Sequence, residues 1–189
     1  MTKKIIIITA PSGAGKTSII HYLLDKYPHL LTFSVSATTR LPRHYETNGK
    51  DYYFIPVADF QHKIEQNDFV EWEMVYEGKY YGTLRSELER IWAQNRTPIL
   101  DIDVKGALRI QENYAGSHLS IFIQPPSVEE LKKRLEKRGT ETPESLAYRV
   151  EKAAYELSFR DRFDFVVTNH HLDTACKETG EIIKQFLAE

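Results

Sequence analysis

The chain is poor in the residues that build disulfides, metal clusters and membrane spans. Cys176 is the only cysteine among 189 residues, which excludes an internal disulfide and a zinc cluster of cysteines. This usage suits a reducing compartment, so we expect a cytoplasmic location. No apolar run approaches the roughly 20 residues that span a bilayer, so we expect a soluble protein without a membrane partner.

A signal peptide and a large net charge are also missing. The apolar stretch after the first lysines covers about six residues before Pro11, whereas a signal peptide needs roughly 7–15. Lysine and arginine number 25 against 27 for aspartate and glutamate, so the formal net charge is −2. This balance gives no general attraction to nucleic acid, and an anion site must come from local placement of Arg and Lys. The sequence identifies no protein partner.

Strand and helix patterns alternate along most of the chain. Continuous apolar runs predict buried strands at Ile5–Thr9, Thr97–Ile102, Leu119–Ile123 and Asp164–Val167. Helical periodicity and capping signals predict helices at Ser18–Lys26, Leu84–Ala93, Val104–Asn113 and Ser127–Arg138, a further helix that opens at Thr142 and Pro143, and a last helix with Cys176, Thr179, Ile183 and Phe186 on one face. The alternation predicts an α/β fold with a parallel sheet.

Residues 33–83 have a different composition. Ser, Thr, Arg and Gly are mixed there with aromatic residues such as Tyr45, Tyr52 and Tyr81. Short strands and one helix, Val57–Gln66, predict an inserted lobe with a small mixed sheet. A polar and aromatic lobe is suited to gripping a flat, charged ligand.

The first apolar run leads into "APSGAGKT", which resembles a phosphate-binding loop. Ala10 stands where the pattern Gly-x4-Gly-Lys-[Ser/Thr] begins with glycine. Gly13 and Gly15 permit the backbone angles that turn successive N–H groups inward around an anion, and the following helix adds its positive dipole end. Lys16 would reach the β- and γ-phosphates, and the Thr17 hydroxyl would ligate Mg²⁺. The alternative is a glycine turn that only links a strand to a helix.

Two carboxylates follow the second apolar strand. Asp101 and Asp103 in "PILDIDVKG" lie at its carboxyl end, where α/β sheets collect ligands. Their spacing places both side chains on one face if the strand continues. One could organise magnesium, directly or through water, and the other could contact a substrate. Ordinary solvated carboxylates are the alternative.

The inserted lobe carries a candidate phosphate clamp in "SVSATTRLPRHYETNGKDYYF". Arg40 and Arg43 lie three residues apart, and Tyr52 follows nine residues later. Two guanidinium groups and a phenol suit a phosphate dianion, because arginine binds oxygens through a bidentate fork. Two such arginines alone would ordinarily indicate a solvated loop.

A candidate base-reading group lies in the same lobe. Glu71, in "FVEWEMVYEGKYYGT", could accept hydrogen bonds from N1–H and the N2 amino group of guanine, a donor pair that adenine lacks. The hydroxyls of Ser36 and Thr83 could donate to guanine O6. A lone glutamate in an amphipathic strand is otherwise a surface residue.

The quoted stretches, with "YYGT", "PPSVEELKKRLEKRGTET" and "YRVEKA", occur in the order and at the spacing of one family. The chain resembles guanylate kinases over nearly its entire length. The resemblance implies the reaction ATP + GMP ⇌ ADP + GDP with Mg²⁺, in purine nucleotide metabolism. It also implies a P-loop NTPase-type parallel sheet flanked by helices, with an inserted mixed GMP-binding lobe and a helical lid. One domain, 1–189, would then divide into a core (1–32, 84–124 and 143–189), the lobe (33–83) and the lid (125–142).

The resemblance also assigns roles to residues. ATP binding falls to Ser12, Gly13, Ala14, Gly15, Lys16, Thr17, Arg134, Arg138 and Asn169. GMP binding falls to Ser36, Arg40, Arg43, Tyr52, Glu71, Tyr81, Gly82, Thr83 and Asp101. Catalysis falls to Lys16, Arg43, Arg138 and Arg149, and the metal to Thr17 with Asp101 or Asp103, directly or through water.

The chain departs from the family pattern after its last strand. His170 and His171 follow Asn169, where the family often has Asn-Asp. Adjacent histidines without a carboxylate or cysteine partner in sequence indicate surface residues instead of metal ligands. The hairpin "MVYEGKYYG" is one residue longer than in several relatives.

Two rival functions remain open at this level. One is a phosphopeptide-binding scaffold domain, which the retained Gly15-Lys16-Thr17 disfavours. The other is a kinase of a sugar phosphate, which the combination of Ser36, Glu71 and Thr83 disfavours.

Overall fold

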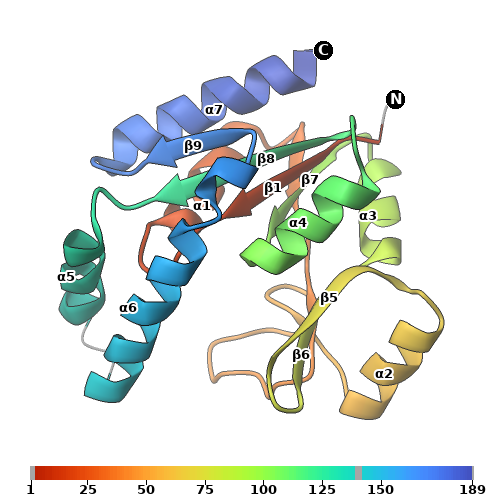
Figure 1. The fold of residues 1–189 in the computed structure, drawn as a ribbon. Helices are drawn as coiled ribbons and strands as arrows, with labels where there is room; N and C mark the ends of the chain where they lie inside the picture. Colours follow the sequence, from red (N-terminus) through yellow and green to blue (C-terminus); the bar gives the residue numbers. More distant parts are fainter. Residues whose placement is uncertain (1–2, 139–141, 189) are drawn as a thin grey trace.

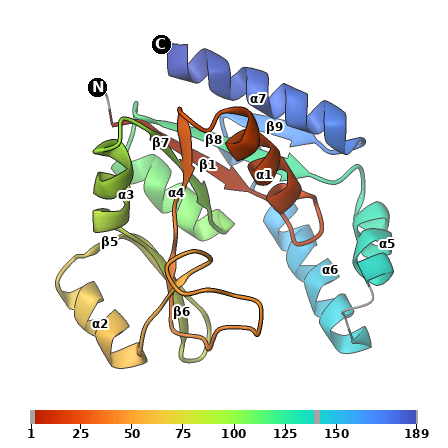
Figure 2. The ribbon, with the colours of Figure 1, turned by 180° about the vertical axis from the view of Figure 1, so that it is seen from behind.

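A computed structural model of the chain describes residues 3–138 and 142–188, and it contains two sheets (Figures 1 and 2). Five strands form the first, in the order β2-β7-β1-β8-β9, and every pair is parallel. Its strands are β1 (Ile5–Thr9), β2 (Leu31–Phe33), β7 (Thr97–Asp101), β8 (His118–Gln124) and β9 (Phe165–Thr168). The predicted α/β fold with a parallel sheet is confirmed.

Helices cover both faces of the parallel sheet. On one face lie α1 (Lys16–Lys26) and α7 (Leu172–Ala188), and on the other α3 (Arg85–Trp92) and α4 (Val104–Asn113) (Figures 1 and 2). The isoleucines of β1 serve both layers, because Ile6 and Ile8 pack with α1 and α7 while Ile5 and Ile7 pack with α3 and α4. A strand buried on both faces therefore reads as an unbroken apolar run.

The predicted elements agree with the structure within about two residues at their ends, as expected for patterns read from sequence. The strand β2 and the 3₁₀ turn Arg160–Arg162 have no counterpart among them. Within the described residues, no helix is both long and apolar enough to span a membrane.

The inserted lobe has a mixed sheet of its own. Its strands run in the order β4-β3-β6-β5 and comprise β3 (Ala37–Thr38), β4 (Tyr53–Phe54), β5 (Phe69–Tyr76) and β6 (Lys79–Leu84). The helix α2 (Val57–Glu65) closes this layer, and the buried Phe60 ring stacks on Phe69 with their centroids 4.3 Å apart. The lobe thus has its own small apolar core.

Two further helices lie on the opposite side of the molecule from the lobe. They are α5 (Val128–Arg138) and α6 (Pro143–Leu157) (Figures 1 and 2). Both begin as predicted: Ser127 Oγ accepts from Glu130 N at 3.1 Å, and Thr142 Oγ1 accepts from Ser145 N at 3.2 Å. Residues 139–141 of the expected lid lie outside the described part of the chain, and the boundaries of core, lobe and lid stay predictions.

A buried carboxylate on α3 joins the core to the lobe. The side chain of Glu87 accepts hydrogen bonds from Val35 N at 3.0 Å and from the Tyr53 hydroxyl at 2.9 Å. Arg90 adds two more, at 2.9 and 2.7 Å. Burial alone would raise the pKa of Glu87, but these bonds outweigh it and lower the pKa. The segments that enter the lobe are therefore tied to a helix of the core.

We expect Glu87→Ala to lower the free energy of unfolding by about 2–3 kcal/mol, because the buried Val35 N–H would lose its acceptor. Glu89→Ala on the same helix is the control, since its ion pair with Lys3 is exposed and worth at most about 1 kcal/mol. Urea unfolding of both variants measures the difference, and equal losses would contradict this role for Glu87.

Candidate functional site

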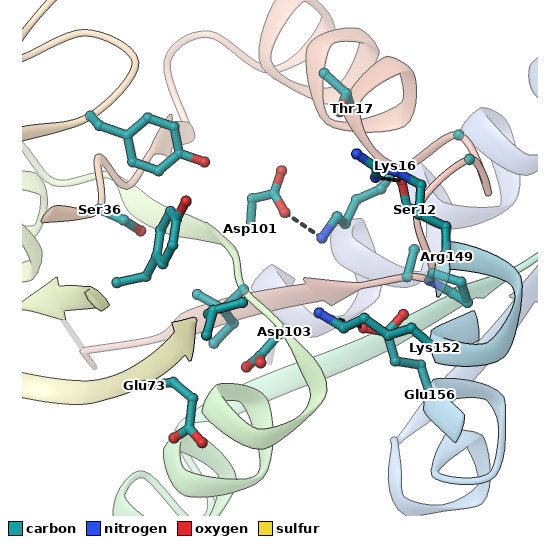
Figure 3. A pocket seen from close by; sticks show the side chains of 18 of the residues that line it. Ser12, Lys16, Thr17, Ser36, Glu73, Asp101, Asp103, Arg149, Lys152 and Glu156 are labelled. Atoms are coloured by element: carbon teal, nitrogen blue, oxygen red, sulfur yellow. Dashed lines mark hydrogen bonds and ion pairs between the residues drawn. The ribbon is translucent and has the colours of Figure 1, made fainter. Parts of the chain in front are cut away.

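A cleft of about 1140 Å³ opens at the carboxyl ends of the parallel strands (Figure 3). It lies between the glycine loop, the end of β7, the lobe and α6. The structure brings together most of the expected site residues in its lining, namely Ser12, Gly13, Gly15, Lys16, Thr17, Ser36, Arg43, Tyr52, Glu71, Tyr81, Gly82, Asp101, Asp103 and Arg149. Tyr45, Glu73, Lys152 and Glu156 also line it and were not predicted.

Other expected residues are absent from this lining. They are Ala14, Arg40, Thr83, Arg134 and Asn169. Arg138 is the last residue of α5, and its side chain lies outside the part of the chain that the structure describes. Arg40 and Thr83 contact the lining residues Tyr52 and Glu71, and Asn169 contacts the glycine loop at Ala14.

The glycine loop has the backbone that the sequence predicts. Gly13 and Gly15 have φ angles of 94° and 97°, in the left-handed region that favours glycine. Gly15 is the N-cap of α1, so the first N–H groups of that helix point at the cleft. A side chain at Gly15 would collide with the amide of Asn169. This geometry suits an anion such as a nucleotide phosphate.

The side chain of Asn169 supports the glycine loop through a hydrogen bond. Its side-chain amide donates to Ala14 O at 2.8 Å, its backbone N–H donates to Gln124 O at 2.8 Å, and it is 4% exposed. Arg134 donates to Asn169 O at 3.0 Å and to Glu130 at 3.1 Å, so α5 is linked to the same support. A contact of Asn169 or Arg134 with ATP stays a prediction.

Lys16 and Asp101 form an ion pair in the centre of the cleft, with Nζ and Oδ1 2.5 Å apart. Asp101 is the last residue of β7 and pairs in register with Ile8 of β1, so the two neighbouring strands deliver both groups to one place. Burial lowers the pKa of Lys16, but the Asp101 carboxylate outweighs that effect and raises it. Lys16 therefore stays protonated and points into the cleft (Figure 3).

Asp101 and Asp103 would share one face only if the strand continued through both, and it does not. The strand ends at Asp101, and Asp103 is the N-cap of α4, where its Oδ1 accepts from Gly106 N at 2.9 Å. This cap satisfies a free N–H group in the first turn of α4. Asp103 still lines the cleft.

The arginines of the lobe are held by partners that the sequence analysis missed. Glu46 Oε2 and Oε1 accept from Nη1 and Nη2 of Arg40, both at 2.6 Å, and the Glu46 side chain is only 6% exposed. The hydrogen bonds from Arg40 lower the pKa of Glu46 to about 2. The guanidinium carbon of Arg40 also lies 4.9 Å from the ring centroid of Tyr52. The signal for this contact in the sequence was the position of Glu46, which follows Arg40 and Arg43 and precedes Tyr52.

Arg43 and Tyr45 form a second contact on the cleft side of the same loop. Arg43 Nη1 donates to the Tyr45 hydroxyl at 3.0 Å, and both residues line the cleft. Arg40 is therefore held behind Tyr52, whereas Arg43 is exposed to the cleft.

Glu71 is a buried residue of β5 that lines the cleft on the side of the lobe. It is 6% exposed, and its Oε1 accepts a hydrogen bond of 2.6 Å from the Thr83 hydroxyl. Burial raises the pKa of Glu71 to about 7, since the hydrogen bond from Thr83 only partly offsets desolvation. The Thr83 proton is thus directed at Glu71 in this structure, while the expectation placed it on guanine O6.

One face of α6 forms the wall opposite the lobe. Arg149 Nη1 donates to Ser12 Oγ at 2.7 Å, which joins this wall to the glycine loop (Figure 3). Lys152 and Glu156 follow at steps of three and four residues, with Nζ and Oε1 3.8 Å apart. Burial raises the pKa of Glu156. The spacing of these residues along the helix was a signal that the sequence analysis left unused.

The sequence model of the family described as guanylate kinase matches residues 2–186. The chain belongs to the guanylate kinase family. It is similar to a guanylate kinase of Porphyromonas gingivalis, with 47% identity over 186 residues, 98% of this chain and 99% of that protein. A guanylate kinase of Bacteroides thetaiotaomicron is 46% identical over 187 residues, 99% of this chain and 91% of that protein.

A solved structure supports the same family. The crystal structure of guanylate kinase from Anaplasma phagocytophilum matches with a TM-score of 0.77 and 30% identity, covering 96% of this chain and 85% of that one. These similarities confirm the expected family, the fold and guanylate kinase activity. The scaffold and sugar-phosphate alternatives find no support among them.

We expect Asn169→Ala to lower the free energy of unfolding of the nucleotide-free protein by about 1–2 kcal/mol, because the buried Ala14 carbonyl would lose its donor. Thermal unfolding without nucleotide measures this loss. His170→Ala, at the exposed neighbouring position, is the control. An unchanged stability together with weaker ATP binding would show that Asn169 acts on the nucleotide and does not brace the loop.

Proposed function

We propose that the chain transfers the γ-phosphoryl group of ATP to GMP across this cleft, with the glycine loop holding ATP and the inserted lobe holding GMP. The observation that carries the proposal is that Lys16, Arg43 and Glu71, from three separate parts of the chain, line one cleft. Such a cleft can hold a triphosphate and a monophosphate nucleotide face to face. A cytoplasmic location stays a prediction from the cysteine usage.

The donor side would bind the phosphates of ATP through backbone N–H groups of residues 12–17 and through the Lys16 ammonium. Lys16 is held by Asp101 within the same cleft, so a bound phosphate would share it with that carboxylate. Arg149 reaches this side through Ser12, which supports its placement near the transferred group. Arg138 retains its proposed role at the end of α5.

The acceptor side would bind GMP at both of its ends. Tyr52 and Tyr81, whose ring centroids lie 6.0 Å apart, with Arg40 and Arg43, would hold the phosphate. Glu46 and Leu41 O engage both hydrogens of Arg40 Nη1, and Glu46 engages one hydrogen of Nη2, so the edge formed by Nε and Nη2 is the one that would receive phosphate oxygens.

The base would lie deeper in the lobe, where the cleft wall includes Ser36, Glu71 and Gly82. The Glu71 carboxylate would accept from N1–H and the N2 amino group of guanine. Asp101 lies between this region and Lys16, so it would contact the acceptor nucleotide or its metal.

The residues also suit a magnesium ion. Thr17, Asp101 and Asp103 all line the cleft, and hydroxyl and carboxylate oxygens are the donors that Mg²⁺ takes beside nucleotide phosphates. The ion, when bound, would neutralise negative charge on the transferring phosphoryl group.

Positioning and charge neutralisation supply the chemistry. A phosphate oxygen of GMP forms the new bond to the γ-phosphorus, and the bond from that phosphorus to the bridging β-phosphate oxygen breaks, which releases ADP. The attacking oxygen is already an anion, so no side chain needs to remove a proton. Lys16 and the arginines of both walls would offset the charge that gathers on the equatorial oxygens.

We expect Glu71→Gln to raise the KM for GMP by about 10–100-fold with little change in the KM for ATP, because an amide cannot accept both guanine donors. Glu73→Gln, on the same strand and the same cleft wall, is the matched control and should keep the KM for GMP. Steady-state assays with GMP and AMP measure both. Equal turnover of AMP and GMP by the unmodified protein would contradict the guanine assignment.

We expect kcat/KM for GMP to fall as the pH drops below about 7, because Glu71 then gains a proton and loses an acceptor site. The second ionisation of the GMP phosphate, near about 6, adds its own inflection, so the profile must be compared with that of Glu71→Gln. An inflection that persists near 7 in this variant would contradict the assignment to Glu71.

A further inference from the structure

A glycine in the first turn of α4 lies directly against the Glu71 carboxylate. A Cβ atom at Gly106 would lie 2.7 Å from Glu71 Oε2, 3.3 Å from Glu71 Cδ and 3.3 Å from Asp103 Oδ1. Gly106 is buried, and its φ angle lies outside the left-handed region. The backbone at this position would therefore accept any residue, and only the space beside it requires glycine.

Glycine destabilises a helix relative to alanine, so its presence at this position indicates that the space beside it is needed. Within a helix, alanine is favoured over glycine because it restricts the unfolded chain and exposes less backbone. The other glycine inside a long helix, Gly180 of α7, has no such neighbour, since its Cβ would find its nearest atom, Tyr27 Oη, at an ordinary 3.4 Å. The close approach at Gly106 is specific to the carboxylate.

The two oxygens of Glu71 face two different elements. Oε1 is held by the Thr83 hydroxyl of β6 at 2.6 Å, and Oε2 occupies the space that a side chain at Gly106 would fill. A carboxylate that accepts two parallel hydrogen bonds from one edge of a base must have both oxygens at a set depth and angle. Thr83 holds one oxygen in place, and Gly106 leaves the space that the other occupies.

We propose that Gly106 is a specificity-determining residue that positions Glu71 for guanine. The inference rests on the proposed function, because it assigns Glu71 to the base. Gly106 touches no substrate itself and acts through the carboxylate that it admits. A methyl group here meets no backbone atom and comes closest to the far end of the Glu71 side chain, with the Asp103 carboxylate next, so its largest effect falls on the position of Glu71.

The test uses Gly106→Ala with Gly180→Ala as the matched control in another helix. For each variant, kcat/KM is measured with GMP and with IMP, which lacks the 2-amino group, together with the KM for ATP and the Tm. We expect Gly106→Ala to lower kcat/KM for GMP by at least about tenfold and to shrink the preference for GMP over IMP. The KM for ATP should not change, the Tm should be equal or higher, and Gly180→Ala should keep the kinetics of the unmodified protein.

A second comparison ties the effect to Glu71. In a Glu71→Gln background, Gly106→Ala should add little further loss of GMP use, because both changes act through one group. Full additivity would overturn the inference, as would a Gly106→Ala variant that keeps the GMP preference or loses GMP, IMP and ATP use together with Tm. If Glu71→Gln itself left GMP use unchanged, the proposed base-reading role would fail first, and the inference would fall with it.

Discussion

The contact between Lys16 and Asp101 is the point on which the site depends. It exists because β1 and β7 are neighbours in a parallel sheet, so both strands end at the same edge. The 2.5 Å pair keeps the ammonium charged and directed into the cleft. Under the proposed function, a phosphate that binds the glycine loop would share Lys16 with this carboxylate.

Three carboxylates hold parts of the lobe in place, and their surroundings give them different pKa values. Glu87 joins the lobe to α3, and Glu46 fixes the orientation of Arg40. The hydrogen bonds from Arg40 lower the pKa of Glu46 to about 2, whereas burial outweighs the bond from Thr83 and raises the pKa of Glu71 to about 7. One residue type thus provides a permanent anion in one place and a titratable hydrogen-bond acceptor in the other.

Local patterns in the sequence predicted most of the architecture. A strand covered on both faces, such as Ile5–Thr9, appears as an unbroken apolar run, and the residues of the glycine loop are consecutive, so both are visible in the sequence. The three residues of β2 are too few to show a period. Local patterns also could not predict side-chain contacts such as those of Glu46 with Arg40 and of Thr83 with Glu71. These contacts depend on the tertiary arrangement of the loops and strands. The cap that Asp103 forms on α4 was likewise not predicted, although the helix itself was.

The most direct test of the account is a crystal structure of the protein with GMP and a non-hydrolysable ATP analogue. We predict that the GMP phosphate contacts Arg40, Arg43 and the hydroxyls of Tyr52 and Tyr81, that Glu71 accepts from the guanine edge, and that Lys16 contacts the phosphates of the analogue. A structure in which GMP occupies the glycine loop, or in which its phosphate lies away from both arginines, would contradict the account.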